Sequence, residues 1–486
     1  MLFDRLVNEC SLGGICGGCN YVMKPAEDAS ESESTKQAQD KCSYAFQLSE
    51  KETRVRSLLE GACKDEDFGF EGIEASPLYF AYRNKMEYSF GDECKDGPLT
   101  LGLHKKRSFY DVVDADCCNL VHEDLNRIVS TVGYYFRQLG LSYTDKRTHL
   151  GYLRHLLIRR AVNTGEILID LVTTSQPLIP VEKHSDINNI GIYDPAGFVK
   201  VPDQTADGAQ TGRRGRGRRG SDIEIIPGAV RAAEGVETLD EQAVLGGLVQ
   251  RLVLLEYAGA LEGKIAGILH TVNDSLSDAI KNDRTDLLYG EDHITEELLG
   301  LKFQISPFSF FQTNTKGAEL LYSKVREFIG EELGPDMRVF DLYSGTGTIA
   351  QMLAPCVKEV VGVEIVEEAV EAARENAAKN GLTNCSFIAD DVLHALDTLE
   401  APDLIIMDPP RDGVNPKALK KIIDYGVKNM VYVSCKPESL ARDLEMLRYA
   451  GYRVVRSVAV DQFPWTQNVE SCVLLERVSN EMQILT

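Results

Sequence analysis

The sequence predicts an α/β protein whose C-terminal part is a doubly wound parallel sheet, preceded by a central α+β region. From about residue 335 onward, apolar strand-like runs alternate with helical segments, whereas residues 75–175 hold shorter runs that alternate apolar and polar positions. Strands that alternate with helices form parallel sheets, and short alternating runs separated by turns form hairpins. We therefore expect three regions, residues 1–74, 75–310 and 311–486.

Length and charge set limits on the class of protein. A chain of 486 residues is too long for one ordinary domain, and 43% hydrophobic residues suffice for several cores. The net charge of −23 argues against a surface coated with nucleic-acid-binding charge, although a local basic cleft remains compatible with it. There is no apolar run of membrane-spanning length and no secretory layout at the start, so we expect a cytosolic protein with no membrane partner.

Two segments lack any hydrophobic period. One is the polar stretch PAEDASESESTKQAQD, which follows the first cysteines. The other lies near residues 200–235 and carries five arginines between positions 213 and 219, interleaved with glycines. We expect both to be disordered insertions. The arginine run is either a basic arm that grips RNA or a solvated loop, and both interpretations stay open.

The central region is expected to begin with short strands in residues 75–118 and to continue with a helix over residues 119–140. A hairpin over residues 150–175 should turn at Asn163-Thr164-Gly165. In the C-terminal region, strands are expected in MRVFDLYSGTG, EVVGVEIV, CSFIAD, DLIIMDPP and NMVYVSC. The helix VEEAVEAARENAAKN should end at Gly381.

A ligand site is expected at the carboxyl ends of the parallel strands. Asp341 opens a glycine turn that ends at Gly347, and glycines let the backbone approach a ligand closely. Acidic residues end the next strands: Glu364, which suits a ribose with two hydroxyls, then Asp390 and Asp391 near an adenine, then Asp408.

This layout predicts a Rossmann-like class I domain that binds S-adenosylmethionine. The third glycine that nicotinamide enzymes prefer is absent, because Thr348-Ile349-Ala350 stands there. The alternative is a purely structural α/β domain with aspartates that cap helices.

A cysteine follows the last parallel strand, in Ser434-Cys435-Lys436-Pro437. A buried structural cysteine is the ordinary alternative, but polar neighbours surround this one, and Lys436 and Arg442 are expected to favour its thiolate. A thiolate that adds to C6 of uracil makes C5 nucleophilic toward a methyl donor, after which a base must remove the C5 proton.

Glu470 is the best candidate for that base. Trp465 nearby would raise the pKa of Glu470 by desolvation, so that it accepts a proton near neutrality. The alternative is a solvated or ion-paired glutamate. Asp408 or Arg411 would orient the ring or stabilise developing charge.

A set of motifs matches a known family over nearly the whole chain. They are YRNKMEYSFG (82–91), LRHLLIRR (153–160), SPFSFFQTN (306–314), DLYSGTGTIA (341–350), DPPRDGV (408–414), SCKP (434–437) and FPWTQNVES (463–471). The chain resembles the RNA uracil-C5 methyltransferases, in particular the bacterial 23S rRNA branch that carries an iron–sulfur cluster.

The resemblance implies that Cys435 is the nucleophile and that Glu470 abstracts the proton. It also implies that Phe310 stacks on a flipped base or its neighbour. The expected contacts to S-adenosylmethionine are Gln312, Tyr343, Thr348, Glu364, Asp391 and Asp408.

The chain departs from the family in three places. Asn468 stands where the family often has histidine, and Lys436 stands where it often has asparagine. We also expect no N-terminal β-barrel RNA-binding module, since the sequence opens directly on the cysteine cluster. The arginine run at 213–219 is a candidate to compensate for that missing grip on RNA.

Closely spaced cysteines predict a metal site. Cys10, Cys16 and Cys19 supply three thiolates, and Cys117 or Cys118 is the candidate fourth, with the family pattern favouring Cys118. Spacing alone leaves tetrahedral zinc and a 4Fe–4S cluster both open, and the resemblance favours the iron–sulfur cluster. Its expected role is structural, because methyl transfer needs no electrons.

The expected activity is therefore methylation of uridine C5 in RNA, with 23S rRNA as the partner, residues 75–310 as the RNA-binding domain and a monomer as the active form. Three alternatives remain: the same chemistry on uridine 54 of tRNA, a methyltransferase of proteins or small molecules, and a cluster-bearing RNA-binding protein without catalysis. The paired Cys435 and Glu470 argue against the last two.

Overall fold

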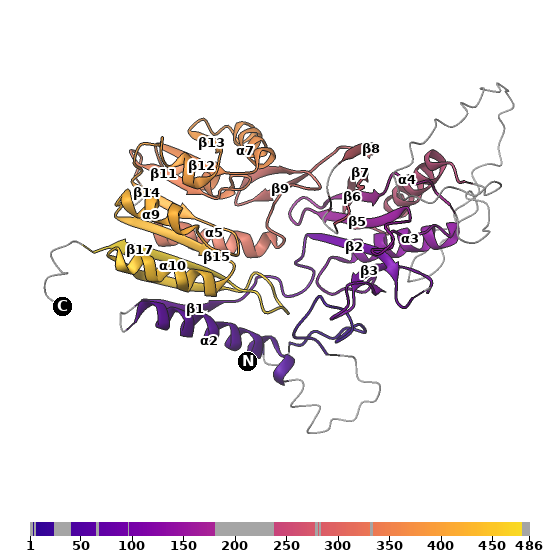
Figure 1. Cartoon of the computed structure of the whole chain (residues 1–486), viewed down its shortest axis with the longest axis horizontal. Coiled ribbons are helices and arrows are strands. Elements are labelled where there is room, and N and C mark those ends of the chain that lie inside the picture. Colours follow the sequence, from indigo (N-terminus) through magenta and orange to yellow (C-terminus); the bar gives the residue numbers. More distant parts are fainter. Residues whose placement is uncertain are drawn as a thin grey trace.

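The computed structural model describes residues 3, 6–23, 40–64, 68–95, 97–179, 238–277, 280, 283–330 and 334–478. The predicted insertion near residues 200–235, with its arginine run, lies outside the described residues, as does nearly all of the polar stretch after the first cysteines. The described residues form two bodies that lie side by side (Figure 1).

The C-terminal body is built on an eight-stranded sheet. Its order is β1-β16-β17-β15-β14-β11-β12-β13, with five neighbouring strands parallel and β17 antiparallel to both of its neighbours. The strands are β1 (Phe70–Glu74), β11 (Arg338–Leu342), β12 (Glu359–Glu364), β13 (Cys385–Ala389), β14 (Leu404–Met407), β15 (Asn429–Ser434), β16 (Tyr452–Val460) and β17 (Glu470–Arg477).

Helices cover both faces of this sheet, so the predicted doubly wound fold is confirmed. Alternate residues of β14 and β15 enter different cores: Ile406 and Val431 join one, whereas Ile405 and Met430 join the other. The helices are α5 (Thr315–Ile329), α6 (Thr348–Leu353), α7 (Glu367–Lys379), α8 (Val392–Ala395), α9 (Pro416–Asp424) and α10 (Pro437–Tyr449), with a 3₁₀ turn η3 (Ala354–Cys356).

The N-terminal region adds two elements to this body that the sequence did not predict. Strand β1 (Phe70–Glu74) pairs in parallel with β16 and forms one edge of the sheet. Helix α2 (Tyr44–Cys63) packs beside α10, where Val55 and Leu59 join the core that contains Leu440 (Figure 1). The domain boundary at residue 74 remains a prediction, although these contacts tie residues 44–74 to the C-terminal sheet.

The central body holds a seven-stranded sheet of order β4-β3-β2-β5-β6-β7-β8. The predicted hairpin is confirmed, since β5 and β6 pair antiparallel around Gly165, which has a φ of 76°. The helix expected over 119–140 is also confirmed as α3. The elements are β2 (Lys85–Asp92), β3 (Leu99–His104), β4 (Val112–Asp114), α3 (Glu123–Leu139), β5 (Leu153–Arg160), β6 (Glu166–Thr173), α4 (Glu241–Tyr257), β7 (Lys264–Val272) and β8 (Arg284–Gly290).

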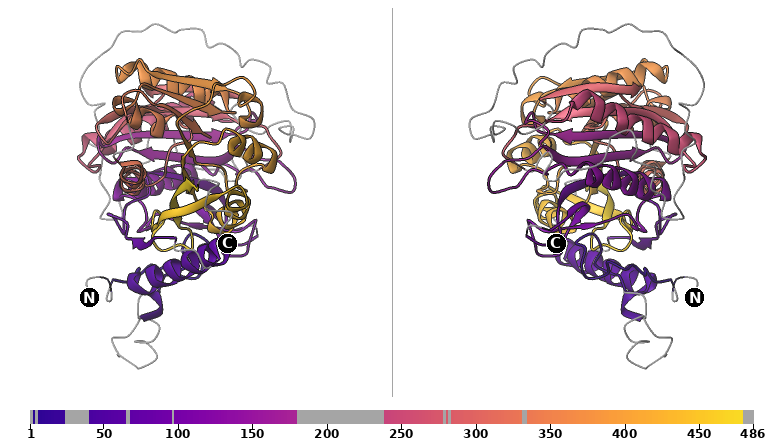
Figure 2. Two further views of the ribbon diagram at one scale, coloured as in Figure 1. Left: turned by 90° about the vertical axis from the view of Figure 1, so that its left-hand side faces the viewer. Right: turned by 90° about the vertical axis from the view of Figure 1, so that its right-hand side faces the viewer.

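Helices α3 and α4 pack on one face of the central sheet, through a core that includes Tyr88, Val129 and Leu248. Figures 1 and 2 place these helices on the side of the sheet that points away from the C-terminal body. The hairpin of β9 (Ile294–Leu298) and β10 (Leu301–Ile305) and the segment 306–314 connect the two bodies. Among the described residues, none of the helices is long and apolar enough to span a membrane.

Candidate active site

Four of the predicted site residues lie at the carboxyl ends of the parallel strands in the C-terminal sheet, which meet on one side of it. They are Glu364, Asp408, Cys435 and Glu470. The glycine turn follows β11, Glu364 ends β12, Asp408 follows β14 and Cys435 follows β15. β17 runs in the opposite direction and brings its first residue, Glu470, to the same side. The register pairs Ser434 with Ser471, so Cys435 and Glu470 continue from neighbouring strand ends.

The glycine turn is a tight, ligand-facing loop. Tyr343, Gly345 and Gly347 all have positive φ, at 64°, 52° and 72°. A Cβ atom at Gly347 would lie 2.5 Å from the ring of Phe387, so only glycine fits there. The amide of Gly345 donates a hydrogen bond of 3.1 Å to Oε2 of Glu364, which ties the turn to the end of β12.

Two buried polar atoms in this turn are poised for a ligand. Oδ1 of Asp341 and Oγ of Ser344 have no hydrogen-bond partner among the described residues, whereas Oδ2 of Asp341 accepts from the amide of Ala350 at 2.9 Å. A buried polar atom without a partner costs folding free energy unless a bound group satisfies it. The donors and acceptors of this turn therefore fit the polar groups of a nucleoside cofactor.

The other predicted cofactor residues come from three further segments, which are α6, the start of α8 and the linking segment 306–314. Thr348 begins α6 and is buried. Oδ1 of Asp391 caps α8 by accepting from the amide of Leu393 at 2.7 Å. Gln312 approaches from the linking segment, where its Oε1 accepts from Nε2 of Gln462 at 2.9 Å.

Phe310 lies against the glycine turn. Its side chain is 67% exposed, and its ring lies 3.6 Å from the position that a Cβ of Gly345 would take. Arg159 of β5 holds this segment by donating to the carbonyl oxygens of Pro307, at 3.0 Å, and of Ser309. The predicted stacking of Phe310 on a base remains a prediction.

Burial controls the protonation of the candidate nucleophile and base. The pKa of the fully buried Glu470 is raised to about 8, first by desolvation and then by the charge of Asp408, with Arg411 opposing the rise. Desolvation also raises the pKa of Cys435 to about 11, with Glu470 and Asp408 adding to it and Arg411 lowering it. The pKa of Asp408 is raised by burial to about 7. Arg411 is therefore the cation that lowers the pKa of both Cys435 and Glu470.

The prediction that Lys436 and Arg442 favour the Cys435 thiolate is wrong. The guanidinium of Arg442 turns away and donates to Oδ1 of Asp443, at 2.9 and 2.8 Å, and to the carbonyl oxygen of Asp412. Lys436 is the exposed N-cap residue of α10. The cation that lowers the pKa of the thiol is Arg411.

The segment that leads to Glu470 is anchored by a buried ion pair that the sequence analysis missed. Nζ of Lys51 lies 2.6 Å from Oδ1 of Asp461, and both side chains are almost completely buried. Oδ2 of Asp461 accepts from the hydroxyl of Tyr44 at 2.6 Å and from Nε2 of Gln47 at 3.2 Å. The signal was the spacing of Tyr44, Gln47, Lys51 and Val55, which puts them on one face of α2.

Trp465 lies in the same segment and is fully buried. Its ring stacks on Phe80 at 5.2 Å, and its Nε1 donates to the carbonyl oxygen of Tyr79 at 2.6 Å. The amides of Asn20 and Tyr21, just after the cysteine cluster, donate to its carbonyl oxygen at 2.8 and 3.2 Å. The cysteine loop is thus in direct contact with the segment that ends at Glu470, while the predicted effect of Trp465 on Glu470 remains a prediction.

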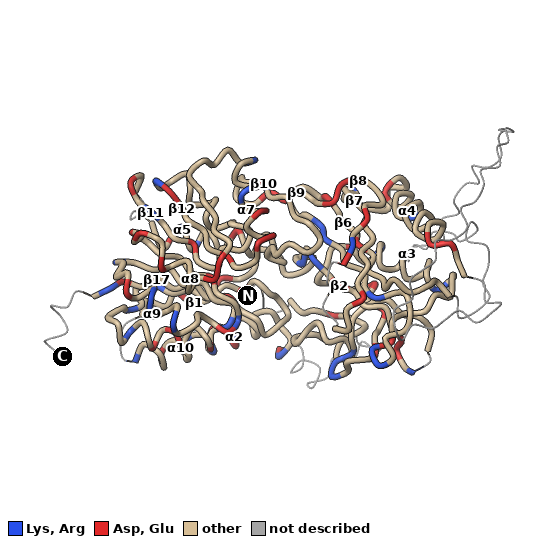
Figure 3. Tube along the Cα trace, turned by 45° about the horizontal axis from the view of Figure 1, so that its top comes forward, with Lys and Arg blue, Asp and Glu red and all other residues tan. Residues whose placement is uncertain are grey.

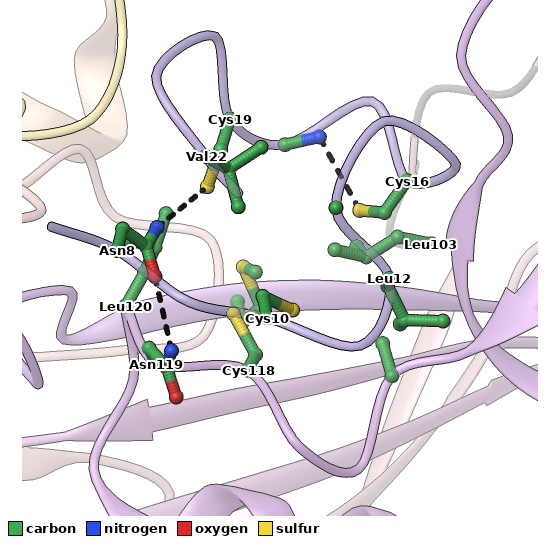
Figure 4. A pocket seen from close by; sticks show the side chains of 14 residues that line it. Asn8, Cys10, Leu12, Cys16, Cys19, Val22, Leu103, Cys118, Asn119 and Leu120 are labelled. Atoms are coloured by element: carbon green, nitrogen blue, oxygen red, sulfur yellow. Dashed lines mark hydrogen bonds between the residues drawn. The ribbon is translucent and has the colours of Figure 1, made fainter. Parts of the chain in front are cut away.

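Four of the predicted cysteines line one cavity of about 40 Å³ between the N-terminal loop and the central sheet (Figure 4). They are Cys10, Cys16, Cys19 and Cys118. Cys117 is exposed outside the lining, with its Sγ 3.3 Å from Oγ of Ser11. Within the part of the chain that the structure describes, no three His, Cys, Asp or Glu side chains are close enough together to hold a metal ion as they stand.

Comparisons with known proteins agree with this arrangement. The family model described as tRNA (uracil-5-)-methyltransferase matches residues 280–478. An uncharacterized RNA methyltransferase of Clostridium acetobutylicum is 41% identical over 470 residues, which are 96% of this chain and 84% of that protein. Another, from Caldanaerobacter subterraneus, is 41% identical over 97% of this chain and 85% of its own length.

A solved structure shares the fold. The tRNA (uracil-54, C5)-methyltransferase of Pyrococcus abyssi, in complex with S-adenosyl-L-homocysteine, superposes with a TM-score of 0.60 at 24% identity and covers 89% of this chain and 83% of that one. The chain therefore shares the fold of that methyltransferase. Together with the relatives that match almost end to end, this shows that the chain belongs to the RNA (uracil-5-)-methyltransferase family.

Proposed function

We propose that this chain methylates C5 of a uridine in 23S rRNA, with Cys435 as the nucleophile and Glu470 as the base. The observation that carries this proposal is the convergence of Cys435 and Glu470 on one sheet edge, beside Asp408, Arg411 and the glycine turn. Methyl transfer to proteins or small molecules does not require this pair of residues.

The residues divide the work as follows. The Cys435 thiolate forms a bond to C6 of the uracil, which makes C5 nucleophilic. Bound S-adenosylmethionine supplies the electrophilic methyl group. Glu470 then takes the proton from C5, and the bond between the Cys435 sulfur and C6 breaks as the double bond returns. Arg411 favours the ionised forms of both catalytic groups.

The cofactor is held by the glycine turn and the acidic strand ends. The buried Asp341 and Ser344 oxygens support this assignment, because they lack partners within the described residues. In this proposal the contacts to S-adenosylmethionine are made by the residues expected from the sequence, which are Gln312, Tyr343, Thr348, Glu364, Asp391 and Asp408.

The kcat/KM for RNA is expected to rise with pH in two steps, through about 8 as Glu470 ionises and then toward about 11 as the Cys435 thiol ionises. Glu470 accepts a proton only when it is ionised, and burial holds its pKa at about 8, so raising the pH through that value fills the active form. Arg411→Met removes the cation that lowers this pKa, so the rising limb should move to higher pH. Initial rates measured from pH 6 to 10 check this, with the exposed Lys417→Met on α9 as the control. A limb that does not move would contradict the role of Arg411.

We also propose that Cys10, Cys16, Cys19 and Cys118 hold a 4Fe–4S cluster. Four thiols on one largely apolar cavity support this, since thiolates are the usual ligands of such clusters. Protein purified without oxygen is expected to contain about four iron atoms per chain and to absorb visible light. A colourless protein loaded with zinc would contradict the proposal. Cys117→Ala, the matched control, should retain the iron.

The choice of RNA is open to a direct test. The solved relative acts on uridine 54 of tRNA, which makes tRNA the second candidate substrate. 5-Methyluridine is mapped in 23S rRNA and tRNA from cells that lack this gene, and from the same cells complemented with the wild type or with Cys435→Ala. Loss of a 23S rRNA site that only the wild type restores supports the proposal. Loss of the methyl group at tRNA position 54 instead would show that tRNA is the substrate.

We expect a cytoplasmic monomer to perform the reaction.

A further inference from the structure

A cavity of about 220 Å³ opens on the central sheet, where β2 ends and β5 begins. Among the described residues that line it there is no carboxylate, although the chain has a net charge of −23. The polar part of the lining consists of Ser89, Thr144, Lys146, His149, Arg154 and His155. A cavity with this set of donors and cations suits an anionic, oxygen-rich ligand.

The polar atoms of the cavity are held close together. Oγ of Ser89 lies 3.4 Å from both Nε2 of His104 and Nδ1 of His155, and Nζ of Lys146 lies 3.1 Å from Nε2 of His104. The guanidinium of Arg154 is fixed by backbone carbonyl oxygens in the segment after β7. Because its N–H groups already donate to these carbonyl oxygens, Arg154 contributes positive charge, and Ser89, Lys146 and His155 supply the donors that match the oxygens of a phosphate.

An aromatic platform adjoins this cavity. A second cavity, of about 110 Å³, shares Thr144 and Lys146 with the first and reaches Tyr110 in the loop between β3 and β4. Tyr110 is 53% exposed, its neighbour Phe109 is 81% exposed, and the Arg147 guanidinium lies 5.1 Å from the centre of the Tyr110 ring. Exposed aromatic faces beside cations bind the bases of single-stranded nucleic acid.

The two cavities differ in charge, which separates their roles. The smaller one also holds Asp92, Asp111 and Asp145, so a phosphate belongs in the larger cavity and an uncharged base beside Tyr110. Figure 3 shows Lys and Arg segments in the loops along the lower edge of the body that carries β2 and α3.

The larger cavity lies on the sheet face that leads toward the candidate active site. Ser89 is paired with His155, and Lys85 with Arg159, four residues further along both strands, so all four share one face. Arg159 contacts the segment that carries Phe310. At about 3.3 Å per residue, the two rows are roughly 13 Å apart, a span of a few nucleotides. The helices cover the opposite face of the sheet (Figures 1 and 2).

We propose that this surface binds the substrate RNA beside the target uridine, with a backbone phosphate in the cavity of Lys146 and His155 and an unpaired base on Tyr110. The proposal rests on the proposed function for the nature of the RNA, and it deepens that function by assigning a second contact to the same substrate. It gives an acidic chain a local basic site for its polyanionic partner.

Two variants test the surface, and each has a matched control. Lys146→Gln is compared with Lys358→Gln, whose exposed side chain precedes β12 at the other edge of the C-terminal sheet from Cys435. Tyr110→Ala is compared with Tyr257→Ala, which is 87% exposed at the end of α4. RNA affinity is measured against KCl concentration with unmodified 23S rRNA transcribed in vitro, and methyl transfer is measured as separate kcat and KM.

Lys146→Gln is expected to make the plot of log affinity against log salt shallower by about 0.7, the value for one phosphate contact on a single strand. Tyr110→Ala is expected to weaken binding roughly 5- to 150-fold, as loss of one stacked base does. Both should raise KM and leave kcat unchanged, and the controls should match the wild type.

Unchanged affinity and salt dependence in both variants would overturn the proposal, as would inorganic phosphate or uridine 5′-monophosphate binding as tightly as RNA. A wild type that binds RNA through these residues yet methylates no RNA would leave the surface standing and remove the proposed function. If both variants methylate RNA with the KM of the wild type, the proposed function stands and the proposed RNA-binding surface is wrong.

Discussion

Cys435→Ala is expected to lower the rate of methyl transfer by at least about 10⁴-fold, because removing the nucleophile of a covalent enzyme costs that much or more. Without the thiolate, C5 of uracil is not activated toward the methyl group, and neither Glu470 nor Arg411 can replace that bond. The glycine turn does not depend on Cys435, so S-adenosylmethionine should bind with unchanged affinity. Transfer of labelled methyl to RNA and calorimetric titration of the cofactor measure the two quantities.

A second cysteine in the same sheet provides the control. Cys385 begins β13, at the other end of the strands from the glycine turn, and its Sγ contacts only a backbone carbonyl among the described hydrogen bonds. Cys385→Ala should therefore keep its activity. With RNA that contains 5-fluorouridine, the wild type should form an adduct that survives denaturing electrophoresis, and Cys435→Ala should form none. An adduct in the variant would place the nucleophile elsewhere.

Lys51→Met is expected to destabilise the region around Glu470 by about 3–5 kcal/mol, since it leaves the Asp461 carboxylate buried without its cation. The loss should reduce activity as well, because Asp461 begins the segment that positions Glu470. Urea unfolding followed by tryptophan fluorescence measures the effect. Trp465 is the single tryptophan of the chain and lies buried in this segment, so its signal reports on the region of interest.

The same helix supplies an exposed ion pair for comparison. Arg56 and Glu52 of α2 lie 3.4 Å apart with both side chains substantially exposed. Arg56→Met should cost about 1 kcal/mol or less, since it removes this exposed pair and the contact of the guanidinium with the Phe70 ring, 4.5 Å away. The double variant Lys51→Met with Asp461→Asn should recover part of the loss, because no uncompensated charge remains. If Lys51→Met and Arg56→Met lower the free energy of unfolding equally, the buried ion pair stabilises the protein no more than the exposed one.

The elements that the sequence predicted are those with local signals. The glycine turn before α6, the turn at Gly165 and the alternation of strands with helices each depend on neighbours in the sequence, and the structure has all of them. Strand β1 escaped prediction because FEGIE is short and mostly half-buried, and because its partner β16 lies near the other end of the chain. Pairings of that kind leave no local pattern.

The residues of the candidate site also fall into those with a local sequence signal and those without one. Cys435 and Asp408 are found at strand ends that the sequence marks. The cation that acts on Cys435 was misassigned, because Lys436 is adjacent in sequence whereas Arg411 reaches the thiol from the end of another strand. Lys51 was missed since a lysine on a helix is normally solvated. Only its spacing with Tyr44 indicated a buried face.

The pairing of β1 with β16 also has a consequence for synthesis of the chain. Oγ of Ser457 donates a hydrogen bond to the carbonyl oxygen of Phe68, 389 residues earlier in the chain. The edge of the catalytic sheet therefore cannot form until almost the whole protein has left the ribosome. Contacts of such long sequence separation slow folding and leave strand edges open to aggregation meanwhile. A fragment that starts at residue 311 would expose β16 as an unprotected edge, so the catalytic sheet is expected to fold well only when residues 44–74 are supplied with it.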